Sequence, residues 1–477
     1  MKGSRLVRDL GLQVGARQVL DRPADLAAYG YDAFGASGER HLPDAVVFPG
    51  STAEVSAVVQ VCADHEVAVV PRGAGTGYSG GAVPRAGGVV ISLTRMSAVL
   101  GLEPEAMRMH AEAGMVTAAI HRRALGCGLH YPPDPGSSST CTIGGNVACN
   151  AAGPHTLRYG TTADHLVGAT VVLADGRVAH LGEGGDGGAD LLRMVCGSEG
   201  TLGIVTEVLL RLLPAPAARS TVAAGFAGME EAATAVAALS AAGLVPAAVE
   251  FLDSAALRAV ARTGVDAYAP DAGALLLVEL EGDPASVASE LDAAMTAIAT
   301  GSPEGVEMAA DPAGQRRLWA ARKAISAAVA TVMIGKVNED VVVPRDRIAE
   351  LVARVRRLGA EHSVPVVNFG HLGDGNLHAT FLIDPRLPGD RARGDAAAAG
   401  LFDTVLDMGG AITGEHGVGS TKLAHVERQL GPGTVALMQR IKGAFDPAGL
   451  MNPGIKVPSR SWEAPATPHS SASNDAP

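Results

Sequence analysis

Two histidines, His371 and His378, enclose a short glycine-rich segment with the sequence HLGDGNLH. We predict a β-strand over Leu377–Ile383, at the end of this segment. Every second residue of the strand is apolar: Leu377, Ala379, Phe381 and Ile383. Because successive side chains of a strand point to opposite faces, His378 and Thr380 would face a polar site. The alternative is a pair of ordinary loop histidines, but the position of His378 opposite an apolar face favours the polar site.

A Glu–His pair, Glu415 and His416, lies among glycines in the sequence TGEHGVG. Two imidazoles and one carboxylate are a common set of three ligands for a divalent metal ion that keeps open coordination positions. The histidines and this pair therefore suggest a metal site. By itself, a GEHG sequence is equally consistent with an ordinary glycine turn.

Basic side chains that could bind a carboxylate precede these segments. We expect a helix over Leu318–Ser326, in which Arg322 and Ser326 are four residues apart and share a face. Lys336 follows, ahead of the sequence NEDVVVP. A guanidinium can bind a carboxylate through two parallel hydrogen bonds, so this face would suit an acidic substrate. A solvated basic face is the alternative interpretation for each of these residues.

A glycine-rich loop, PRGAGTGYSGG, follows a predicted strand at residues 71–81. Gly75, Gly77 and Gly80 match the G-x-G-x-x-G pattern. A dinucleotide-binding turn of that pattern opens directly into a helix and has an acidic residue about 20 positions later. This loop leads instead into another predicted strand, Val89–Leu93, and no acidic residue lies near position 95. No GK[ST] follows either, so neither a Rossmann turn nor a Walker loop is expected.

The loop could still bind an anion. Successive unhindered backbone N–H groups can form a concave anion site, and Arg72 adds positive charge, so a pyrophosphate would fit. Two further glycine clusters occur at residues 131–153 and 197–205. The first of them starts with a rigid run of prolines, and its Gly144 and Gly145 would let the backbone touch a flat ring. Each of these clusters alone is as consistent with ordinary turns as with a ligand-binding loop.

Short β-branched runs in the first half would position the glycine loops. We predict one helix, over Thr52–His65, and strands over Ala45–Phe48, Val67–Val70, Val89–Leu93, Val167–Leu173 and Leu202–Leu212. Prolines at positions 214 and 216 mark a linker, and alanine-rich helices then alternate with strands such as Ala274–Glu279 and Val366–Phe369. We therefore expect an α+β protein with an N-terminal helical segment (1–42), two domains (43–214 and 215–457) and a disordered tail (458–477).

Composition limits the classes of function. The 477 residues carry a formal net charge of −12 without a run of Lys or Arg, which disfavours a nucleic-acid-binding protein. The five cysteines form no CxxC pair, so neither a disulfide scaffold nor an iron–sulfur cluster is expected. The N-terminus lacks an apolar core, and the uncharged stretch 232–249 is broken by Gly243 and Pro246. We expect a cytoplasmic protein, free or peripheral to the membrane, without a transmembrane segment.

In their order and spacing, the three glycine clusters resemble the FAD-binding domain of the vanillyl-alcohol oxidase/p-cresol methylhydroxylase superfamily. The resemblance runs from about Pro43 to Pro214 and implies a two-part FAD-binding domain. The FAD contacts that it implies lie along all three clusters, at Arg72, Gly73, Ala74, Gly75, Thr76, Gly77, Ser79, Gly80, Gly81, Pro133, Asp134, Pro135, Thr142, Gly144, Gly145, Asn146, Glu199, Gly203, Ile204 and Val205. Some relatives attach the flavin covalently through a histidine in the first loop. Ala74 stands at that kind of position here, so the resemblance implies non-covalent FAD.

The rest of the chain resembles the C-terminal domain of the FAD-linked oxidases. Trp319 to Arg322, HLGDGNLH, GEHGVG and the terminal stretch 445–454 recur there in this order. The family includes D-lactate dehydrogenase, the flavin subunit of glycolate oxidase and D-2-hydroxyglutarate dehydrogenase. The resemblance implies an α+β substrate (cap) domain with an antiparallel sheet and a C-terminal helical segment.

Site residues can be carried over from this resemblance one by one. It implies a divalent metal ion, Zn or Mn, with three protein ligands: His371, His378 and Glu415. It makes His416 the general base and makes Arg322 and Lys336 the groups that hold the substrate carboxylate. Ser326 stands where relatives often have a threonine, and we include it among the catalytic residues.

The implied reaction is the FAD-dependent oxidation of a small 2-hydroxy acid, similar to D-lactate, to the 2-oxo acid. The metal would assist as His416 takes the hydroxyl proton and hydride passes to flavin N5. Because the chain has no cysteine cluster, the electrons would go to an external acceptor: a quinone, an electron-transfer protein or an iron–sulfur subunit. The alternatives are the flavin subunit of a glycolate oxidase complex, a D-2-hydroxyglutarate dehydrogenase and, in another class, a non-redox flavoprotein such as an alkylglycerone-phosphate synthase. A homodimer is a further expectation.

Overall fold

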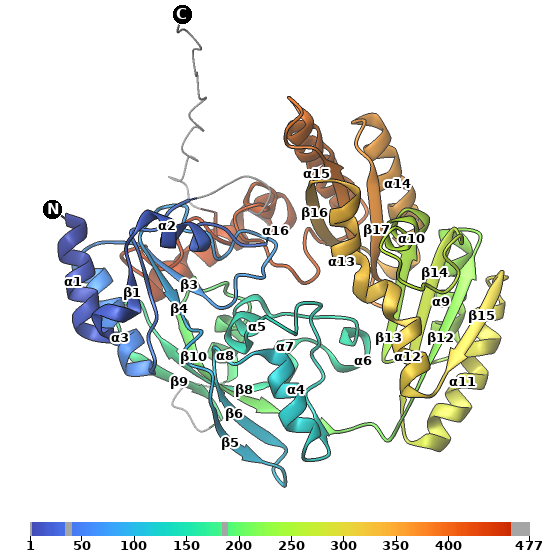
Figure 1. Ribbon diagram of the computed structural model, residues 1–477, viewed down its shortest axis with the longest axis horizontal. Coiled ribbons are helices and arrows are strands. Elements are labelled where there is room, and N and C mark those ends of the chain that lie inside the picture. Colours follow the sequence, from blue (N-terminus) through green and yellow to red (C-terminus); the bar gives the residue numbers. More distant parts are fainter. Residues whose placement is uncertain (1, 34–40, 184–188, 459–477) are drawn as a thin grey trace, which may run out of the picture.

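The computed structural model describes residues 2–33, 41–183 and 189–458. The chain folds into two halves that lie side by side in Figure 1, where the N-terminal half is blue to green and the second half is mainly yellow to orange. Except for Pro458, the tail that we expected to be disordered falls outside the described residues.

Valine-rich runs build the first sheet of the N-terminal half. In spatial order, its strands are β1 (Val19–Leu20), β2 (Ala45–Val47), β4 (Val89–Ser92) and β3 (Val69–Arg72). Strands β2, β4 and β3 are parallel, and β1 pairs antiparallel with β2. Helix α3 (Thr52–Asp64) joins β2 to β3, as the sequence predicts. It begins after Ser51, whose Oγ accepts the Glu54 N–H at 3.2 Å.

The observed strands of the N-terminal half differ from the prediction by one or two residues at most of their ends, and two of these differences bear on the glycine clusters. Strand β3 extends to Arg72, so this arginine leaves the sheet at the start of the glycine loop. Pro71 has no N–H to donate, but a proline is tolerated here because β3 is the last strand of the sheet. Strand β10 (Ile204–Arg211) begins after Gly203 rather than at Leu202.

A second sheet completes the N-terminal half, and all its pairings are antiparallel. Its strands in spatial order are β5 (Val99–Glu103), β6 (Arg108–Glu112), β10, β8 (Leu166–Val172) and β9 (Val178–Gly182). The connecting helices are α4 (Thr117–Leu125), α5 (Ile143–Cys149), α6 (Thr156–Tyr159), α7 (Thr162–His165) and α8 (Ala189–Val195). A two-stranded pair, β7 (Leu129–His130) with β11 (Leu213–Pro214), shows that part of the predicted linker is a short strand.

The N-terminal segment, expected to be helical, also contributes a strand. It forms α1 (Lys2–Val14) and α2 (Pro23–Leu26), and between them β1 joins the first sheet. Leu6, Leu10 and Val14 lie on one side of α1 and are buried in the core of the N-terminal half. The segment therefore packs against the core and the first sheet of the N-terminal half.

The second half is built on one seven-stranded sheet. Every neighbouring pair in it is antiparallel, which confirms the predicted antiparallel sheet. Its strands in spatial order are β15 (Gly305–Ala309), β12 (Ala218–Phe226), β14 (Ala274–Gly282), β13 (Ala248–Asp253), β17 (Val366–His371), β18 (Asn376–Ile383) and β16 (Gly335–Val342).

Helices cover both faces of this sheet. The helices α9 (Met229–Ala241), α11 (Pro284–Ala299), α14 (Ile348–Glu361) and α15 (Asp390–Asp407) pack on one face. The helices α10 (Ser254–Ala261), α12 (Pro312–Leu318) and α13 (Ala320–Val332) lie against the other. As predicted, Leu377 and Phe381 belong to the core between the sheet and α9, α11, α14 and α15, while His378 and Thr380 point to the opposite face.

Helix α9 covers the uncharged stretch of the sequence and ends at Ala241, ahead of a turn, as expected. Within the described ranges, none of the helices combines the length and the apolar character needed to cross a membrane.

The C-terminal segment returns the chain to the N-terminal half. Helix α16 (Leu423–Phe445), drawn in red in Figure 1, is kinked at Gly431. It contributes Val426 and Val435 to the core of the second half, and its Lys442 donates to the Thr201 carbonyl of the N-terminal half at 2.7 Å. Beyond it, the Val69 N–H donates to the Leu450 carbonyl, and the Asn452 N–H donates to the Val69 carbonyl, both at 2.8 Å. These bonds form an isolated parallel bridge between Val69 of β3 and Met451, which connects the C-terminal segment to the first sheet.

The core of the second half yields a stability prediction. Phe381, on β18, is fully buried in the core between the sheet and the helices α9, α11, α14 and α15. Phe381→Ala removes its packing and leaves a cavity, so we expect the free energy of unfolding to fall by about 3–5 kcal/mol in urea denaturation followed by circular dichroism. Met308→Ala, at a position that is 47% exposed on β15, is the control and should change stability by less than about 0.5 kcal/mol. A loss below about 1 kcal/mol for Phe381→Ala would contradict this packing.

Candidate active site

A cavity of about 1040 Å³ lies where the two halves meet. We call it the main cavity. Its walls come from the glycine loop and residues 134–140 of the N-terminal half, and from α13, β16, β17 and β18 of the second half. A narrower cleft within the N-terminal half joins it, because Tyr78, Glu415 and His416 line both. The site therefore needs both halves.

The narrower cleft gathers the residues that the sequence analysis connected with FAD. All but three line it: Arg72, Gly73, Ala74, Gly75, Thr76, Gly77, Ser79, Gly81, Pro135, Thr142, Gly144, Gly145, Asn146, Glu199, Gly203, Ile204 and Val205. Asp134 lines the main cavity instead, and Gly80 and Pro133 are absent from both linings. The Pro133 carbonyl accepts a hydrogen bond from the His121 ring at 2.9 Å. Three clusters far apart in the sequence thus form one cleft.

The start of the cleft suits a phosphate-bearing ligand. Arg72 is 8% exposed, and its Nη1 donates to the carbonyl oxygens of Tyr31 at 2.8 Å and Ala82 at 3.3 Å. Gly75 has a φ of +70°, and a Cβ there would lie 2.2 Å from the Arg72 guanidinium. Only glycine lets the backbone turn this close to the arginine. The glycine backbone and the guanidinium together fit the pyrophosphate of FAD.

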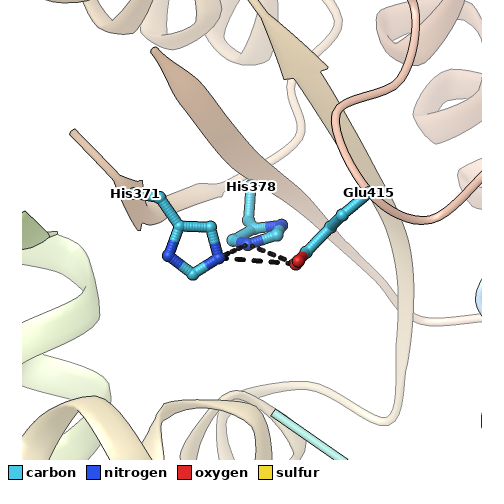
Figure 2. Close-up of side chains that lie close together, drawn as sticks. All are labelled: His371, His378 and Glu415. Atoms are coloured by element: carbon cyan, nitrogen blue, oxygen red, sulfur yellow. Dashed lines mark hydrogen bonds and ion pairs between the residues drawn. The ribbon is translucent and has the colours of Figure 1, made fainter. Parts of the chain in front are cut away.

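Three side chains converge on the wall of the main cavity (Figure 2). His371 ends β17, His378 lies on β18, and Glu415 lies in the loop after α15. The two histidine Nε2 atoms are 3.5 Å apart, and Glu415 Oε1 lies 3.4 Å from His371 Nε2 and 3.3 Å from His378 Nε2. Ligand atoms bound to one tetrahedral ion at Zn–N distances are about 3.3–3.4 Å apart. The donors and their spacing therefore fit a divalent ion such as Zn²⁺.

The electrostatics of this group also suit a cation. Burial lowers the pKa of His378 well below its usual value, which favours the neutral imidazole that binds metals. Burial opposes a charge on His371 too, but the carboxylates of Glu250 and Glu415 outweigh it and raise the pKa to about 10. Burial likewise opposes the charge of Glu415, but its histidine neighbours outweigh it and lower the pKa to about 2. A metal ion would replace the proton of His371.

Glu250 on β13 connects this group to Arg322. It is fully buried; its Oε1 accepts from His371 Nδ1 and its Oε2 accepts from Arg322 Nε, both at 2.5 Å. A carboxylate on the second ring nitrogen fixes the tautomer and the orientation of a ligand histidine. The sequence analysis missed Glu250. A lone acidic residue inside the apolar stretch 247–252 was the available signal, because buried carboxylates are almost always paired.

The residues expected to hold a carboxylate line the same cavity. Arg322 and Ser326 share a face of α13, and Lys336 lies on β16. The Arg322 Cζ is 5.2 Å from the centre of the Phe369 ring, and Lys336 Nζ is 5.3 Å from the centre of the Tyr78 ring. Burial lowers the pKa of Lys336. No carboxylate in the described ranges lies within ion-pair distance of this lysine, which leaves its charge for a ligand.

His416 lies beside the three converging side chains. Its ring is stacked with His378 at a centroid distance of 5.2 Å and tilted against Tyr78 at 5.0 Å. Its Nδ1 lies 3.4 Å from Asp340 Oδ1, and its Nε2 lies 3.7 Å from Glu415 Oε1. Its Nδ1 is buried near Asp340 without a hydrogen bond, and a proton on Nδ1 would leave Nε2 as a proton acceptor next to the group.

Asp340 on β16 holds the loop that carries Glu415 and His416. One oxygen of its fully buried carboxylate accepts the backbone N–H groups of Gly414 and Glu415, each at 2.6 Å, and of His416 at 3.1 Å. The Lys422 ammonium donates to the other oxygen at 2.6 Å. Burial opposes the charge of Asp340, but Lys422 and His416 outweigh it and hold the pKa well below its usual range. The sequence analysis gave no role to Asp340 or Lys422, because neither falls in a recognisable motif.

The buried pair of Asp340 and Lys422 yields a second stability prediction. Lys422 is 2% exposed, so Lys422→Met keeps the length of the side chain but leaves a buried carboxylate without its cation. We expect the free energy of unfolding to fall by about 3–5 kcal/mol, measured by chemical denaturation. Lys323→Met, at an exposed position on α13, is the matched control and should stay within about 0.5 kcal/mol of the wild type. Equal stability of the two variants would refute the role of the pair.

The two halves match two protein families. The family of FAD linked oxidases, C-terminal domain, matches residues 215–455, and the family of FAD binding domains matches residues 43–182. The chain is also similar in fold to solved flavoprotein structures. The structure of p-cresol methylhydroxylase with substrate bound has a TM-score of 0.79 at 18% identity and covers 97% of this chain and 98% of that one. An alkyldihydroxyacetonephosphate synthase has a TM-score of 0.75 at 18% identity, covering 94% and 84%.

The chain is also similar in sequence to named proteins, and each alignment covers most of its length. The glycolate oxidase subunit GlcD of Bacillus subtilis is 35% identical over 94% of this chain and 96% of its own length. The GlcD subunit of Escherichia coli K12 is 36% identical, covering 90% and 86%. The D-lactate dehydrogenase of Anaerostipes hadrus is 35% identical, covering 86% and 89%. With a cofactor cleft in one half and a matching C-terminal domain in the other, the chain belongs to the FAD-linked oxidase family.

Proposed function

We propose that this protein oxidises a small 2-hydroxy acid, similar to D-lactate, to the corresponding 2-oxo acid and passes the electrons to a separate acceptor. One observation carries the proposal. Two histidines and a glutamate at metal-ligand spacing, a further histidine and an arginine line a single cavity that opens onto the glycine-lined cleft. The named relatives support the same chemistry, since they are glycolate oxidase subunits and D-lactate dehydrogenases.

The substrate carboxylate would bind to Arg322 and Lys336. The Nε of Arg322 is already paired with Glu250, which fixes the plane of the guanidinium and leaves its terminal N–H groups for the ligand. Lys336 adds a second positive charge in a partly desolvated position, and Ser326 offers a hydroxyl one turn from Arg322. Held in this way, the acid would have its α-carbon close to the junction of the cavity and the cleft.

His416 would remove the proton of the α-hydroxyl through Nε2, while Asp340 stabilises the imidazolium from the Nδ1 side. Bound FAD would accept the two electrons and the hydrogen that leave the α-carbon. A divalent ion held by His371, His378 and Glu415 would lower the pKa of the hydroxyl. Glu250 would keep the Nε2 of His371 directed at that ion, because it fixes Nδ1 as the protonated nitrogen.

A second candidate is the flavin subunit of a glycolate oxidase complex, because GlcD subunits are among the relatives with the highest coverage of this chain. Such a subunit would need a partner to pass its electrons on. A D-2-hydroxyglutarate dehydrogenase would use the same site with a longer acid. A non-redox flavoprotein of this fold would have no need of the metal-binding group or of His416. An anaerobic experiment on the flavin colour separates these candidates.

The first functional prediction concerns the flavin and its base. Anaerobic D-lactate, L-lactate, glycolate, D-2-hydroxyglutarate and D-malate are each mixed with the FAD-loaded protein, and at least one should bleach the flavin absorbance. In stopped-flow measurements with that acid, His416→Ala should slow the bleaching by about 10²–10⁴-fold while FAD stays bound. His110→Ala, at a half-exposed position outside both cavities, should keep the wild-type rate. Unchanged reduction in His416→Ala rejects it as the base, and no bleaching by any acid rejects the proposed reaction.

The second functional prediction concerns the metal ion. Purified protein should contain a divalent metal detectable by plasma mass spectrometry, and His378→Ala should lose it because one of its three protein ligands is gone. A chelator should suppress flavin reduction, and added Zn²⁺ or Mn²⁺ should restore it. His180→Ala, on β9 away from both cavities, should keep the metal. Full activity of metal-free protein would remove the metal from the mechanism.

A further inference from the structure

The loop of residues 413–419, which carries Glu415 and His416, is held by carboxylates on both sides. Asp340, from the second half, accepts the amides of its first part. Glu199, from the N-terminal half, accepts the amides of its second part. We call residues 413–419 the catalytic loop. It is the part of the second half that both linings share, so its position relative to the cleft matters for any reaction there.

The Glu199 carboxylate bonds to the catalytic loop through both oxygens. Oε1 accepts the Val418 N–H at 2.9 Å, and Oε2 accepts the Gly419 N–H at 2.7 Å. Glu199 is 5% exposed, and the Lys456 ammonium lies 3.5 Å from Oε1. Hydrogen bonds to a charged acceptor are stronger than neutral ones, and more so when the acceptor is buried. The pair of bonds fixes the position of the catalytic loop relative to the cleft.

The backbone around this contact adopts conformations that are otherwise unfavourable. Glu199 has a φ of +56°, which lies in a backbone region that residues other than glycine rarely adopt. Gly417 has a φ of +83°, and a Cβ there would lie 2.8 Å from Glu199 Oε1. The side chain of Asn452 donates to the Glu199 carbonyl at 2.7 Å and so holds this strained residue in place. Strain of this kind persists only where the surroundings enforce it, and it accumulates at functional sites.

A second contact between the halves lies beside the first. The Ser79 hydroxyl donates to the His416 carbonyl at 3.0 Å, and the Ser420 N–H donates to the Ser79 carbonyl at 2.9 Å. Ser79 belongs to the glycine loop of the cleft. The residue expected to act as the base is therefore tied through its own backbone to the loop expected to hold the pyrophosphate.

We infer that Glu199 is a positioning residue, which sets the register between the cofactor cleft and the catalytic loop through its two hydrogen bonds to Val418 and Gly419. The resemblance to the family implies a contact of Glu199 with FAD, and Glu199 lines the cleft; both of its carboxylate oxygens accept hydrogen bonds from the loop. The inference rests on the proposed function for its catalytic consequence only. A displacement of about 1 Å at a reacting group can cost roughly 100-fold in rate, so loss of the contact should slow flavin reduction.

The test compares two carboxylate-to-amide substitutions in the FAD-loaded full-length protein. Glu199→Gln keeps the shape but turns one acceptor into an N–H donor, which faces a loop N–H and cannot bond to it. Glu207→Gln is the matched control. Glu207 lies on β10 of the same half, and its carboxylate bonds to His110 and Thr52 away from both cavities.

Two measurements are made on each variant. Hydrogen–deuterium exchange of peptides that cover residues 413–420 should be about tenfold faster in Glu199→Gln, and unchanged in Glu207→Gln. With a 2-hydroxy acid that bleaches the wild-type flavin, reduction should be roughly 10–100-fold slower in Glu199→Gln at unchanged FAD content. The KM for the acid should change little, because Arg322 and Lys336 are not displaced.

Wild-type exchange of these amides in Glu199→Gln would overturn the inference, as would faster exchange with a wild-type rate of flavin reduction. Loss of FAD with the loop still protected would also overturn it, since it would place the carboxylate on the cofactor. If Glu199→Gln does not fold, Glu199→Asp gives the same comparison, because its side chain is one methylene too short to reach both amides. If no acid bleaches the wild-type flavin, the proposed function fails, and the exchange measurement alone decides the contact.

Discussion

A buried carboxylate must be compensated by hydrogen bonds or by a cation, and this constraint organises the site. Asp340 is fully buried, and three consecutive amides of the catalytic loop, together with the Lys422 ammonium, satisfy it. Anchored in this way, the loop places Glu415 beside His371 and His378 and places His416 in the lining of both the cleft and the main cavity. The position of the chemistry thus follows from the cost of leaving one charge unpaired.

The same constraint acts at Glu250 and links two functions. Its two oxygens are shared between His371 and Arg322, so a residue expected to bind metal and a residue expected to bind substrate are oriented by one carboxylate. Because β13 and β17 are neighbouring strands with Glu250 opposite His371, the sheet register sets this contact. A slip of one residue would turn Glu250 toward the apolar face and separate the two groups.

The two halves contribute different chemistry. Glycine backbone and one arginine line the cleft of the N-terminal half, and the second half contributes histidines, a glutamate and basic side chains to the main cavity. The fold matches p-cresol methylhydroxylase with a TM-score of 0.79 at only 18% identity, so the scaffold tolerates wide change in sequence. The fold alone therefore does not determine the activity, and the proposed reaction rests on a few side chains at the junction of the two halves. The hydrogen bonds of Glu199, Ser79 and Asn452 connect the segments that meet at this junction.

The sequence by itself determined the local features. Alternation of apolar side chains placed His378 opposite the core of β18, and the spacing of Arg322 and Ser326 placed them on one helical face. Glycine clusters marked the cleft, because glycine is needed where the backbone must turn beside a charged group. Only the tertiary structure decided which carboxylates complete the site. Glu250, Asp340 and Lys422 meet their partners across 72 to 121 positions of chain, and Glu199 meets the catalytic loop across about 220. Such pairings depend on which strands become neighbours in the sheet and on the docking of the two halves, and no local pattern in the sequence encodes either.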